Sequence, residues 1–356
     1  MKKRVLVAMS GGVDSSVAAY LLQKEGYDVV GATIKTWSSD ECKDERAKGC
    51  CSIRDITDAR AVAGRLGIPY YVLDLSADFK DKVIDYFVST YVEGRTPNPC
   101  IQCNTHIKFG IFRQKAEEIG AEWMATGHYA RRGQDPATGR YFIREGIDLS
   151  KDQSYVLFGL SQEQLAKTLL PVGEYQKSDI RTMAQELGLR VFDKPDSQEI
   201  CFVPGHYADF LKSAGADLPG QGDVVDRSGR VLAQHEGHHL YTIGQRKRLG
   251  VTDPDPLFVV DIDAAANRIV IGKREELDRL RMKITGINWM LKPEPRDYTV
   301  KIRSRHTKVG MHILELKNDE AVVEFCSPQS AVTPGQAAVI YDGDAVVGGG
   351  WIRSAN

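Results

Sequence analysis

Residues 5–22 read VLVAMSGGVDSSVAAYLL, and this stretch decides the fold of the first part of the chain. It opens with apolar residues, as expected of a short buried strand, and residues 17–22 have the composition of a helix. A glycine- and serine-rich turn, SGGVDSS, joins the two. Backbone N–H groups in such a turn, together with the helix N-terminus, favour an anion such as phosphate. The lysine of a P-loop is missing, which disfavours γ-phosphoryl transfer, and the alternative is a tight turn before a serine-capped helix.

Strand and helix patterns alternate through the first 130 residues. The sequence predicts strands at 4–10, 28–37, 68–76 and 121–130. It predicts helices at 16–26, 56–67, 79–94 and 107–120. This order is typical of a parallel sheet covered by helices. Ligands bind at the carboxyl ends of such strands, where the turn, Thr36 and the Gly127–His128 pair are expected.

The pattern changes along the rest of the chain. Helical stretches at 161–173 and 177–188 are followed by a polar loop at 192–205. Hairpins are then predicted at 222–234 and 257–273. From about residue 281 nearly everything reads as short strand, with a tight turn at Asp342-Gly343. We therefore predict an α/β protein with a parallel-sheet domain at 1–205, a small β-rich domain at 206–280 and a C-terminal β-barrel at 281–356.

Composition limits the functional classes. The chain has 356 residues and a formal net charge of −1, so any nucleic-acid binding must come from local basic patches. No apolar run is long enough to span a membrane. The N-terminal apolar run is too short for a signal peptide, and we expect a cytoplasmic protein.

Three stretches are basic enough to contact nucleic-acid phosphates. Strand alternation through 299–306 predicts one apolar face and one basic face. The basic face holds Lys301, Arg303 and Arg305. The other stretches are 245–248 and Arg131-Arg132. The alternative for the strand is an ordinary solvated face.

Seven cysteines, an odd count in a chain with no export signal, argue for reduced thiols rather than a disulfide framework. Cys100 and Cys103 follow Pro97 and Pro99, so we predict a loop before a helix for this pair. A thiol at a helix N-terminus has its thiolate stabilised and is nucleophilic. Cys201 lies in the predicted polar loop.

The other cysteines are expected to be ordinary residues, with a structural or loop role for Cys50 and Cys51. Cys326 lies in a strand pattern and is predicted to belong to the core. Cys50 and Cys51 are adjacent, which is poor geometry for chelation by both. Cys42 is predicted to be an ordinary residue.

The turn SGGVDSS resembles the signature of the pyrophosphatase-loop ATP-cleaving enzymes, which bind pyrophosphate and adenylate a substrate oxygen. Further stretches resemble the bacterial tRNA-specific 2-thiouridylases along essentially the whole chain. The matching stretches are AMSGGVDSSV, TPNPC with the CN and IKF that follow, ATGHYAR, KDQSYVLF, PDSQEICF and YTIGQRKRLG. The resemblance implies an adenine nucleotide α-hydrolase-like first domain.

The resemblance also implies a transferase reaction. ATP, with Mg²⁺, adenylates the C2 oxygen of the wobble uridine in tRNA, and a persulfide sulfur then replaces that oxygen as AMP leaves. The implied partners are the glutamate, glutamine and lysine tRNAs and a cysteine desulfurase or sulfur-relay protein. Cys201 matches the persulfide-carrying cysteine. Cys103 matches its partner, which helps to release the sulfur and can form a transient disulfide with Cys201.

The resemblance carries two further sets of residues. Nucleotide contacts are implied for Ala8, Met9, Ser10, Gly11, Gly12, Val13, Asp14, Ser15, Ile34 and Gly127. Contacts with tRNA are implied for Asn98, Pro99, Cys100, His128, Lys151, Asp152, Gln153, Arg305, His306 and Gln336. From the residues alone, His128 would be a structural histidine and Gln336 a polar turn residue.

The chain departs from the family at Cys100, where some members have an aspartate proposed as an acid/base. Cys100, Cys103 and Cys201 are an alternative ligand set for a [4Fe-4S] cluster that accepts sulfur on iron. Zinc would need a fourth ligand. Two other functions stay open: a pyrophosphatase-loop ligase acting on a small molecule, and an RNA-binding protein with a relic nucleotide site.

Overall fold

The computed structural model describes residues 2–36, 53–196, 200–203, 205–215 and 217–356. Cys42, Cys50 and Cys51 lie outside these ranges, so their predicted roles are untested. The chain divides into two compact units. The first comprises Met1–Val83, Cys100–Pro204 and Asp344–Val347. The second comprises Ile84–Pro99, Gly205–Gly343 and Gly348–Asn356. Among the described residues, no helix is long and apolar enough to cross a membrane.

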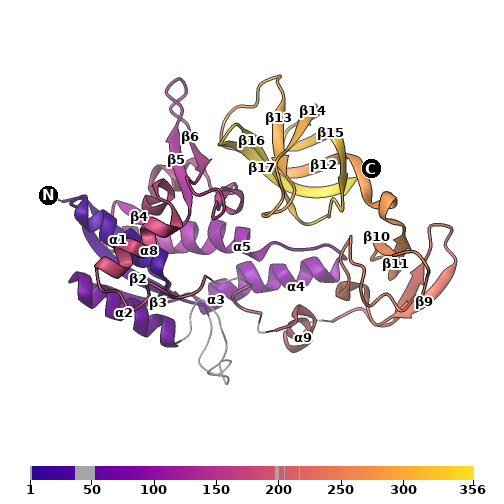
Figure 1. The fold of residues 1–356 in the computed structure, drawn as a ribbon, viewed down its shortest axis with the longest axis horizontal. Coiled ribbons are helices and arrows are strands. Elements are labelled where there is room, and N and C mark those ends of the chain that lie inside the picture. Colours follow the sequence, from indigo (N-terminus) through magenta and orange to yellow (C-terminus); the bar gives the residue numbers. More distant parts are fainter. Residues whose placement is uncertain (1, 37–52, 197–199, 204, 216) are drawn as a thin grey trace. The chain divides into compact units, whose positions relative to one another are not determined.

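A parallel sheet forms the centre of the first unit, as predicted (Figure 1). Its strands run in the order β3-β2-β1-β4-β7, and every neighbouring pair is parallel. They are β1 (Arg4–Ala8), β2 (Asp28–Lys35), β3 (Tyr70–Asp74), β4 (Trp123–Ala125) and β7 (Thr168–Leu169). The chain builds outward from β1 on one side and then continues with β4 on the other. The carboxyl ends of β1 and β4 therefore flank a topological switch point, where ligands bind in sheets of this kind.

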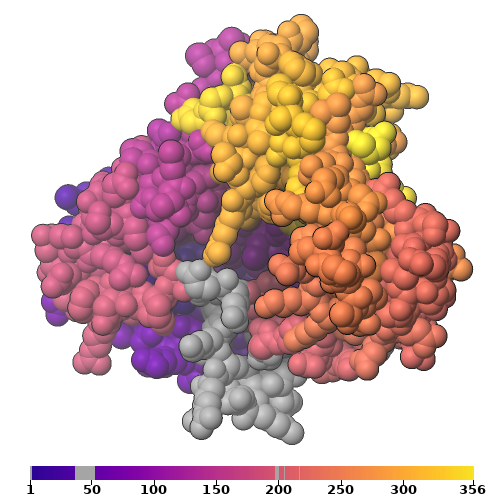
Figure 2. Space-filling view, turned by 45° about the vertical axis from the view of Figure 1, so that its right-hand side comes forward, coloured from indigo at the N-terminus to yellow at the C-terminus, as the bar shows by residue number. Residues whose placement is uncertain are grey.

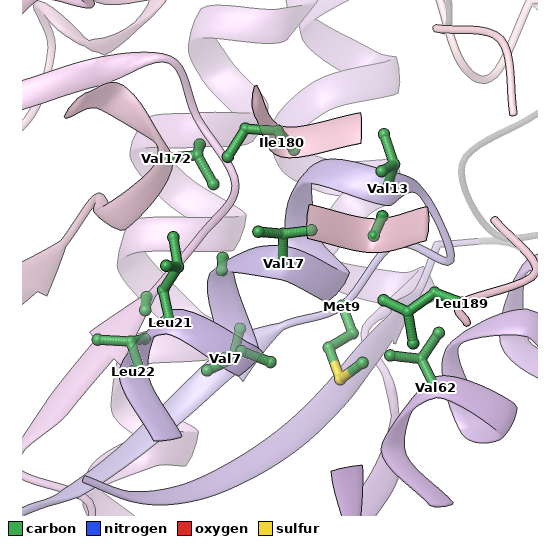
Figure 3. Packing of buried hydrophobic residues seen from close by; sticks show 14 of the residues in the cluster. Val7, Met9, Val13, Val17, Leu21, Leu22, Val62, Val172, Ile180 and Leu189 are labelled. Carbon is green, nitrogen blue, oxygen red and sulfur yellow. The ribbon is translucent and has the colours of Figure 1, made fainter. Parts of the chain in front are cut away.

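Helices α1 (Val13–Lys24), α2 (Ile53–Leu66) and α8 (Lys177–Glu186) pack with β1 in one apolar core. Side chains from all four elements meet in this core (Figure 3). They include Val7, Met9, Val17, Leu21, Val62 and Ile180. Burying each such side chain contributes about 1.5–3 kcal/mol, so the core fixes where α1 begins relative to the end of β1.

Two long helical runs lie close to their predicted places. One comprises α3 (Ser76–Phe79), η1 (Lys80–Ile84) and α4 (Asp85–Val92). The other comprises α5 (Pro99–Gln102), η2 (Cys103–Ile111) and α6 (Phe112–Glu118). The predicted loop at Cys100 and Cys103 is wrong, because the second run already begins at Pro99. Proline lacks an N–H but is tolerated in the first turn of a helix, where that donor has no intrahelical partner.

Several short elements of the first unit were not predicted. The hairpin of β5 (Ala130–Gln134) and β6 (Tyr141–Glu145) occupies the end of the predicted strand 121–130 and the residues after it. The stretch 161–173 is not one helix. It divides into α7 (Gln162–Ala166), β7 and η4 (Pro171–Glu174). A further turn of 3₁₀-helix, η3 (Ser154–Leu157), precedes α7.

The second unit contains the two predicted hairpins. They pair β8 (Gly222–Val225) with β9 (Val231–His235) and β10 (Phe258–Asp263) with β11 (Arg268–Gly272). Their strands form one sheet in the order β10-β11-β8-β9. Three short helices complete this region. They are α9 (Tyr207–Ser213), η5 (His238–Leu240) and η6 (Arg274–Leu277).

The predicted C-terminal barrel is also present (surface in orange and yellow, Figure 2). Its strands run in the order β12-β15-β14-β13-β16-β17, and β12 pairs with β17 to close it. They are β12 (Asp278–Trp289), β13 (Tyr298–Lys301), β14 (Val309–Lys317), β15 (Glu320–Ser330), β16 (Ala337–Asp342) and β17 (Ala345–Ala355).

The predicted basic strand face is wrong in its extent. β13 ends at Lys301, and the chain then bends and turns through Arg303 and Arg305. Val300 and Ile302 do point inward and are buried, as the alternation predicts. Arg303 and Arg305 are exposed, but on a turn rather than in a strand stripe.

Candidate active site

The SGGVDSS turn connects the end of β1 to the start of α1 (Figure 3). Gly12 is the N-cap of α1 in an extended conformation, with no side-chain cap. The alternative of a serine-capped helix is therefore wrong. The hydroxyl of Ser15 instead accepts a hydrogen bond from the backbone N–H of Ser10 at 3.1 Å. The uncapped N-terminal N–H groups and the helix dipole give this turn the character of an anion site.

Two glycines allow the turn to pack closely against α2 and against the backbone after β4. Gly11 has φ +71°, and a Cβ there would lie 2.3 Å from the carbonyl oxygen of Asp55. Gly127 follows β4, and a Cβ there would lie 2.6 Å from the backbone nitrogen of Ser15. Only glycine lets the backbone after β4 approach the first turn of α1 this closely. Gly127 thus stands at the switch point beside the turn, where the prediction put it.

Lys177, the first residue of α8, carries the main charge contact of the turn. Its ammonium group donates to both carboxylate oxygens of Asp14, at 2.7 and 2.8 Å. The hydroxyl of Tyr129 donates to the same carboxylate at 2.6 Å. Lys177 is 8% exposed, so its ammonium group is largely removed from water, while Asp14 is half-buried. In the described structure, a lysine therefore compensates the charge of Asp14.

The same ammonium group reaches a second carboxylate. Lys177 lies 2.8 Å from Asp196, which also pairs with Lys151 at 2.8 Å. Burial alone would raise the pKa of Asp196, but hydrogen bonds from Lys151 and Lys177 outweigh it and lower the pKa. Burial and the neighbouring charge of Asp14 raise the pKa of Tyr129, so its hydroxyl stays a proton donor.

A second lysine holds the other side of the turn. Lys194 donates to the carbonyl oxygen of Gly11 at 2.9 Å and to Asp55 and Asp58 of α2 at 2.7 Å each. Burial would lower the pKa of Lys194, but the two carboxylates raise it overall. Sequence reasoning missed Lys177 and Lys194. Both lysines lie in polar stretches, KSDIR at 177–181 and DKPD at 193–196. Nothing in these stretches alone indicates a role, because their partners at the turn are far away in the sequence.

The remaining predicted nucleotide contacts lie around the same strand ends. Met9 is buried, and its carbonyl accepts a 2.6 Å hydrogen bond from Thr33 of β2. Val13 is buried in the first turn of α1. Ile34 stands at the carboxyl end of β2, one residue beyond Thr33. The geometry brings these residues together at one edge of the sheet.

Cys100, Cys103 and Cys201 lie in the first unit and carry thiols outside any disulfide. Cys100 is exposed, and the other two are half-buried. Cys201 is fixed by its neighbour Phe202, which is buried and packs edge-on against Phe79 at 5.6 Å between ring centroids.

The three thiols do not fit a metal cluster as they stand. Within the described ranges, which include all three, no group of three or more His, Cys, Asp or Glu side chains is arranged to hold a metal ion. An iron–sulfur cluster needs several thiolates converging on one site. Both alternatives, a [4Fe-4S] cluster on the three thiols and a persulfide and disulfide cycle on Cys103 and Cys201, therefore remain predictions.

The other described cysteine differs from its prediction. Cys326 lies on β15, as expected, but it is exposed rather than part of the core. Side chains alternate along a strand, and Phe325 takes the inward place, at 2% exposure.

Most residues predicted to contact tRNA in the first unit are used within the protein. Gln153 accepts from the backbone N–H of Tyr129 at 2.9 Å, and Asp152 accepts from Ser154 at 2.8 Å. Lys151 pairs with Asp196. His128 is buried and bonds Thr126 through Nδ1 at 2.7 Å, which fits a structural histidine. Contacts of these residues with tRNA remain predictions.

The Arg131-Arg132 patch is likewise engaged. Arg131 pairs with Asp344 at 2.7 Å, and Arg132 lies over the rings of Trp123 and Tyr141. These arginines stabilise the β5–β6 hairpin, which leaves less of their charge for a polyanion.

In the second unit, the Gln336 side chain donates to the carbonyl oxygens of Thr96 and Pro97, at 3.2 and 3.0 Å. It thereby holds the backbone that leads through half-buried Asn98 and buried Pro99 to Cys100. His306 follows the turn after β13, half-buried. Burial and the nearby Arg303 and Lys301 lower its pKa.

A parallel sheet with an anion-binding turn at its switch point defines a nucleotide-binding α/β domain. The chain belongs to the family described as the tRNA methyl transferase HUP domain, whose model matches residues 3–205. Models of a tRNA methyl transferase PRC-barrel domain and an aminomethyltransferase β-barrel domain match 208–273 and 279–352.

Curated relatives match over nearly the whole length. A "tRNA-specific 2-thiouridylase MnmA" of Clostridioides difficile is 47% identical and covers 100% of this chain and 99% of its own length. One from Symbiobacterium thermophilum is 48% identical, with 99% and 93% covered. A solved 4-thiouridine synthetase in complex with RNA and ATP is 19% identical, covers 59% of this chain and 50% of its own, and has a TM-score of 0.35.

Replacing Lys177 by Met is expected to weaken nucleotide binding. The change leaves the carboxylates of Asp14 and Asp196 uncompensated beside the anion-binding turn. We expect the Kd for ATP to rise about tenfold, which is about 1.4 kcal/mol, and the free energy of unfolding to fall by about 2 kcal/mol. Calorimetric titration and denaturant unfolding measure the two effects.

Two further variants control this test. Lys177→Arg keeps the cation and should recover most of the affinity. Lys24→Met removes a lysine from the exposed C-terminal end of α1 and should change neither quantity. Equal ATP affinity of Lys177→Met and the wild type would exclude a role of Lys177 at the turn.

His128 is expected to make stability depend on pH. Burial, reinforced by Lys108, lowers the pKa of His128 well below its ordinary 6.5. The unfolded chain therefore takes up a proton below pH 6.5 while the folded protein does not. The wild type should lose about 1.4 kcal/mol per pH unit relative to His128→Asn as the pH falls from 6.5 toward 5. Denaturant unfolding at several pH values measures this, and parallel curves for the two proteins would contradict it.

Proposed function

We propose that the chain is a tRNA-uridine 2-sulfurtransferase, which uses ATP to replace the C2 oxygen of the wobble uridine by sulfur. The observation that carries this proposal is that the anion-binding turn and the thiols of Cys103 and Cys201 belong to one compact unit. The full-length relatives named tRNA-specific 2-thiouridylase support it. Amide-forming ligases with the same turn have no need of two thiols.

The first step is adenylation. The turn from Ser10 to Ser15 binds the β- and γ-phosphates through its backbone N–H groups and hydroxyls. The C2 oxygen of the uridine attacks the α-phosphorus, and pyrophosphate leaves. Mg²⁺, bound to the phosphates of ATP and to water, would neutralise part of the charge on the departing pyrophosphate. The adenylate converts a poor leaving group into a good one.

The second step transfers sulfur. A cysteine desulfurase or relay protein loads Cys201 as a persulfide, whose outer sulfur attacks C2 and expels AMP. The Cys103 thiolate then attacks the inner sulfur, forms a disulfide with Cys201 and leaves the outer sulfur, with the bonding electrons, on C2. A thiol reductant restores both cysteines, which suits the reducing cytoplasm. The substrates are the glutamate, glutamine and lysine tRNAs.

Cys201→Ser separates the two steps. The variant should lose thiolation by at least about a thousandfold and keep tRNA-dependent ATP–pyrophosphate exchange, because serine cannot carry sulfane sulfur. Thiolation is measured by mass spectrometry of nucleosides from transcribed tRNA. Cys326→Ser, which removes a thiol of the second unit, is the matched control and should keep full thiolation. Loss of both steps in Cys201→Ser would count against a persulfide role, and pyrophosphate release without tRNA would indicate a small-molecule ligase.

The turn after β13 is the surface proposed to contact tRNA phosphate. Replacing Arg303 and Arg305 by Ala should weaken tRNA binding and reduce the slope of log K against log salt by about 0.7–0.9 for each phosphate that the arginines neutralise. Arg230, whose side chain is already paired with Asp226 at 3.1 Å, supplies the control variant Arg230→Ala. Filter binding at several salt concentrations measures the slope, and an unchanged slope would remove this turn from the tRNA surface.

A further inference from the structure

Three polar side chains from neighbouring strands meet on the outer face of the barrel. In the β14–β15 pair, Met311 lies opposite Phe325 and both are buried. Their neighbours His312 and Cys326 therefore point outward, and both are exposed. Asp297 precedes β13, the strand on the other side of β14. None of these residues belongs to the site described above.

The three groups stand in the order thiol, imidazole, carboxylate. The Cys326 sulfur lies 3.6 Å from Nε2 of His312, and Nδ1 of His312 lies 2.9 Å from a carboxylate oxygen of Asp297. Because a carboxylate only accepts, Nδ1 carries the imidazole proton. Nε2 is then the basic nitrogen and faces the thiol. A nucleophile, a base and a group that orients the base are the signature of an activated nucleophile.

Gly310 lets the sulfur take this position. It is the next outward-facing residue before His312 on β14, and a Cβ there would lie 2.8 Å from the Cys326 sulfur. Any side chain at 310 would push the thiol off β14 and away from the imidazole. The side chains of His312 and Asp297 are 47% and 82% exposed, so a small molecule can reach the sulfur.

We propose that Cys326, His312 and Asp297 form a thiol–disulfide exchange site that reacts with low-molecular-weight disulfides. His312 Nε2 takes the proton of the Cys326 thiol, and Asp297 stabilises the imidazolium. The thiolate attacks one sulfur of the disulfide, so that a new S–S bond forms to Cys326 and the old one breaks. The departing thiolate takes the proton from His312. One disulfide is consumed, and one mixed disulfide and one thiol are formed.

The test uses the full chain and oxidised glutathione at pH 7.4. Peptide mapping by mass spectrometry after an alkylating quench gives the rate of mixed-disulfide formation at Cys326 separately from the other cysteines. The reference is a peptide of residues 321–331, whose thiol is unassisted. Only about one-tenth of an ordinary thiol is present as thiolate at this pH, so complete ionisation would raise the rate about tenfold. Part of that gain is lost because the thiolate of a more acidic thiol is a weaker nucleophile. The expected acceleration of Cys326 in the protein over the peptide is therefore about fivefold.

Variants assign the acceleration to its source. His312→Gln should abolish it, and Asp297→Asn should reduce it, because the imidazole loses its orientation. Glu315→Gln, which removes another exposed carboxylate of β14, should leave it unchanged. Cys326 reacting no faster than the peptide would overturn the proposal without any variant, and so would an unchanged rate in His312→Gln. Neither outcome bears on the proposed sulfur transfer, because the thiols of Cys103 and Cys201 lie in the first unit.

Discussion

One buried ammonium group organises the candidate active site. Lys177 joins Asp14 of the anion-binding turn to Asp196, a residue 182 positions later in the chain. Breaking such a pair leaves an uncompensated charge in a place with little access to water, which destabilises the fold. The Lys177 side chain therefore joins the turn to the segment at 194–196. Lys194 strengthens the link by holding the Gly11 carbonyl oxygen and two carboxylates of α2.

This linkage connects the two halves of the proposed chemistry. Cys201 follows Asp196 by five residues, and Phe202 is packed against Phe79. Asp196 is thus held by charges at the turn, and the residue after Cys201 is held by an apolar contact. Cys103 is held differently, on a helical run that begins at Pro99. In the proposed cycle Cys201 and Cys103 react one after the other, and the two residues are held by different parts of the fold.

Local patterns were enough to predict the sheet, the glycine-rich turn and the barrel, because apolar periodicity and turn chemistry are written in neighbouring residues. They were not enough for Lys177, whose role depends on a partner 163 positions away. β7 is two residues long and has no periodicity to detect. The basic alternation at 299–306 was real, but the strand stops at Lys301. The start of the helical run at Pro99 was not predicted, because proline was taken to exclude a helix. Proline disrupts the interior of a helix but is tolerated in its first turn.

The charge pairing around the turn also bears on how it holds phosphate. Lys177, Lys194 and Lys151 each have a carboxylate partner already. In the proposed function, an incoming polyphosphate would therefore be held first by the N–H groups and dipole of α1, which have no competing side-chain cap. A lysine of a P-loop, by contrast, would have no carboxylate to balance its charge before the nucleotide binds. By pairing these three lysines with aspartates, the protein keeps three positive charges around the turn, and each of them has a carboxylate partner.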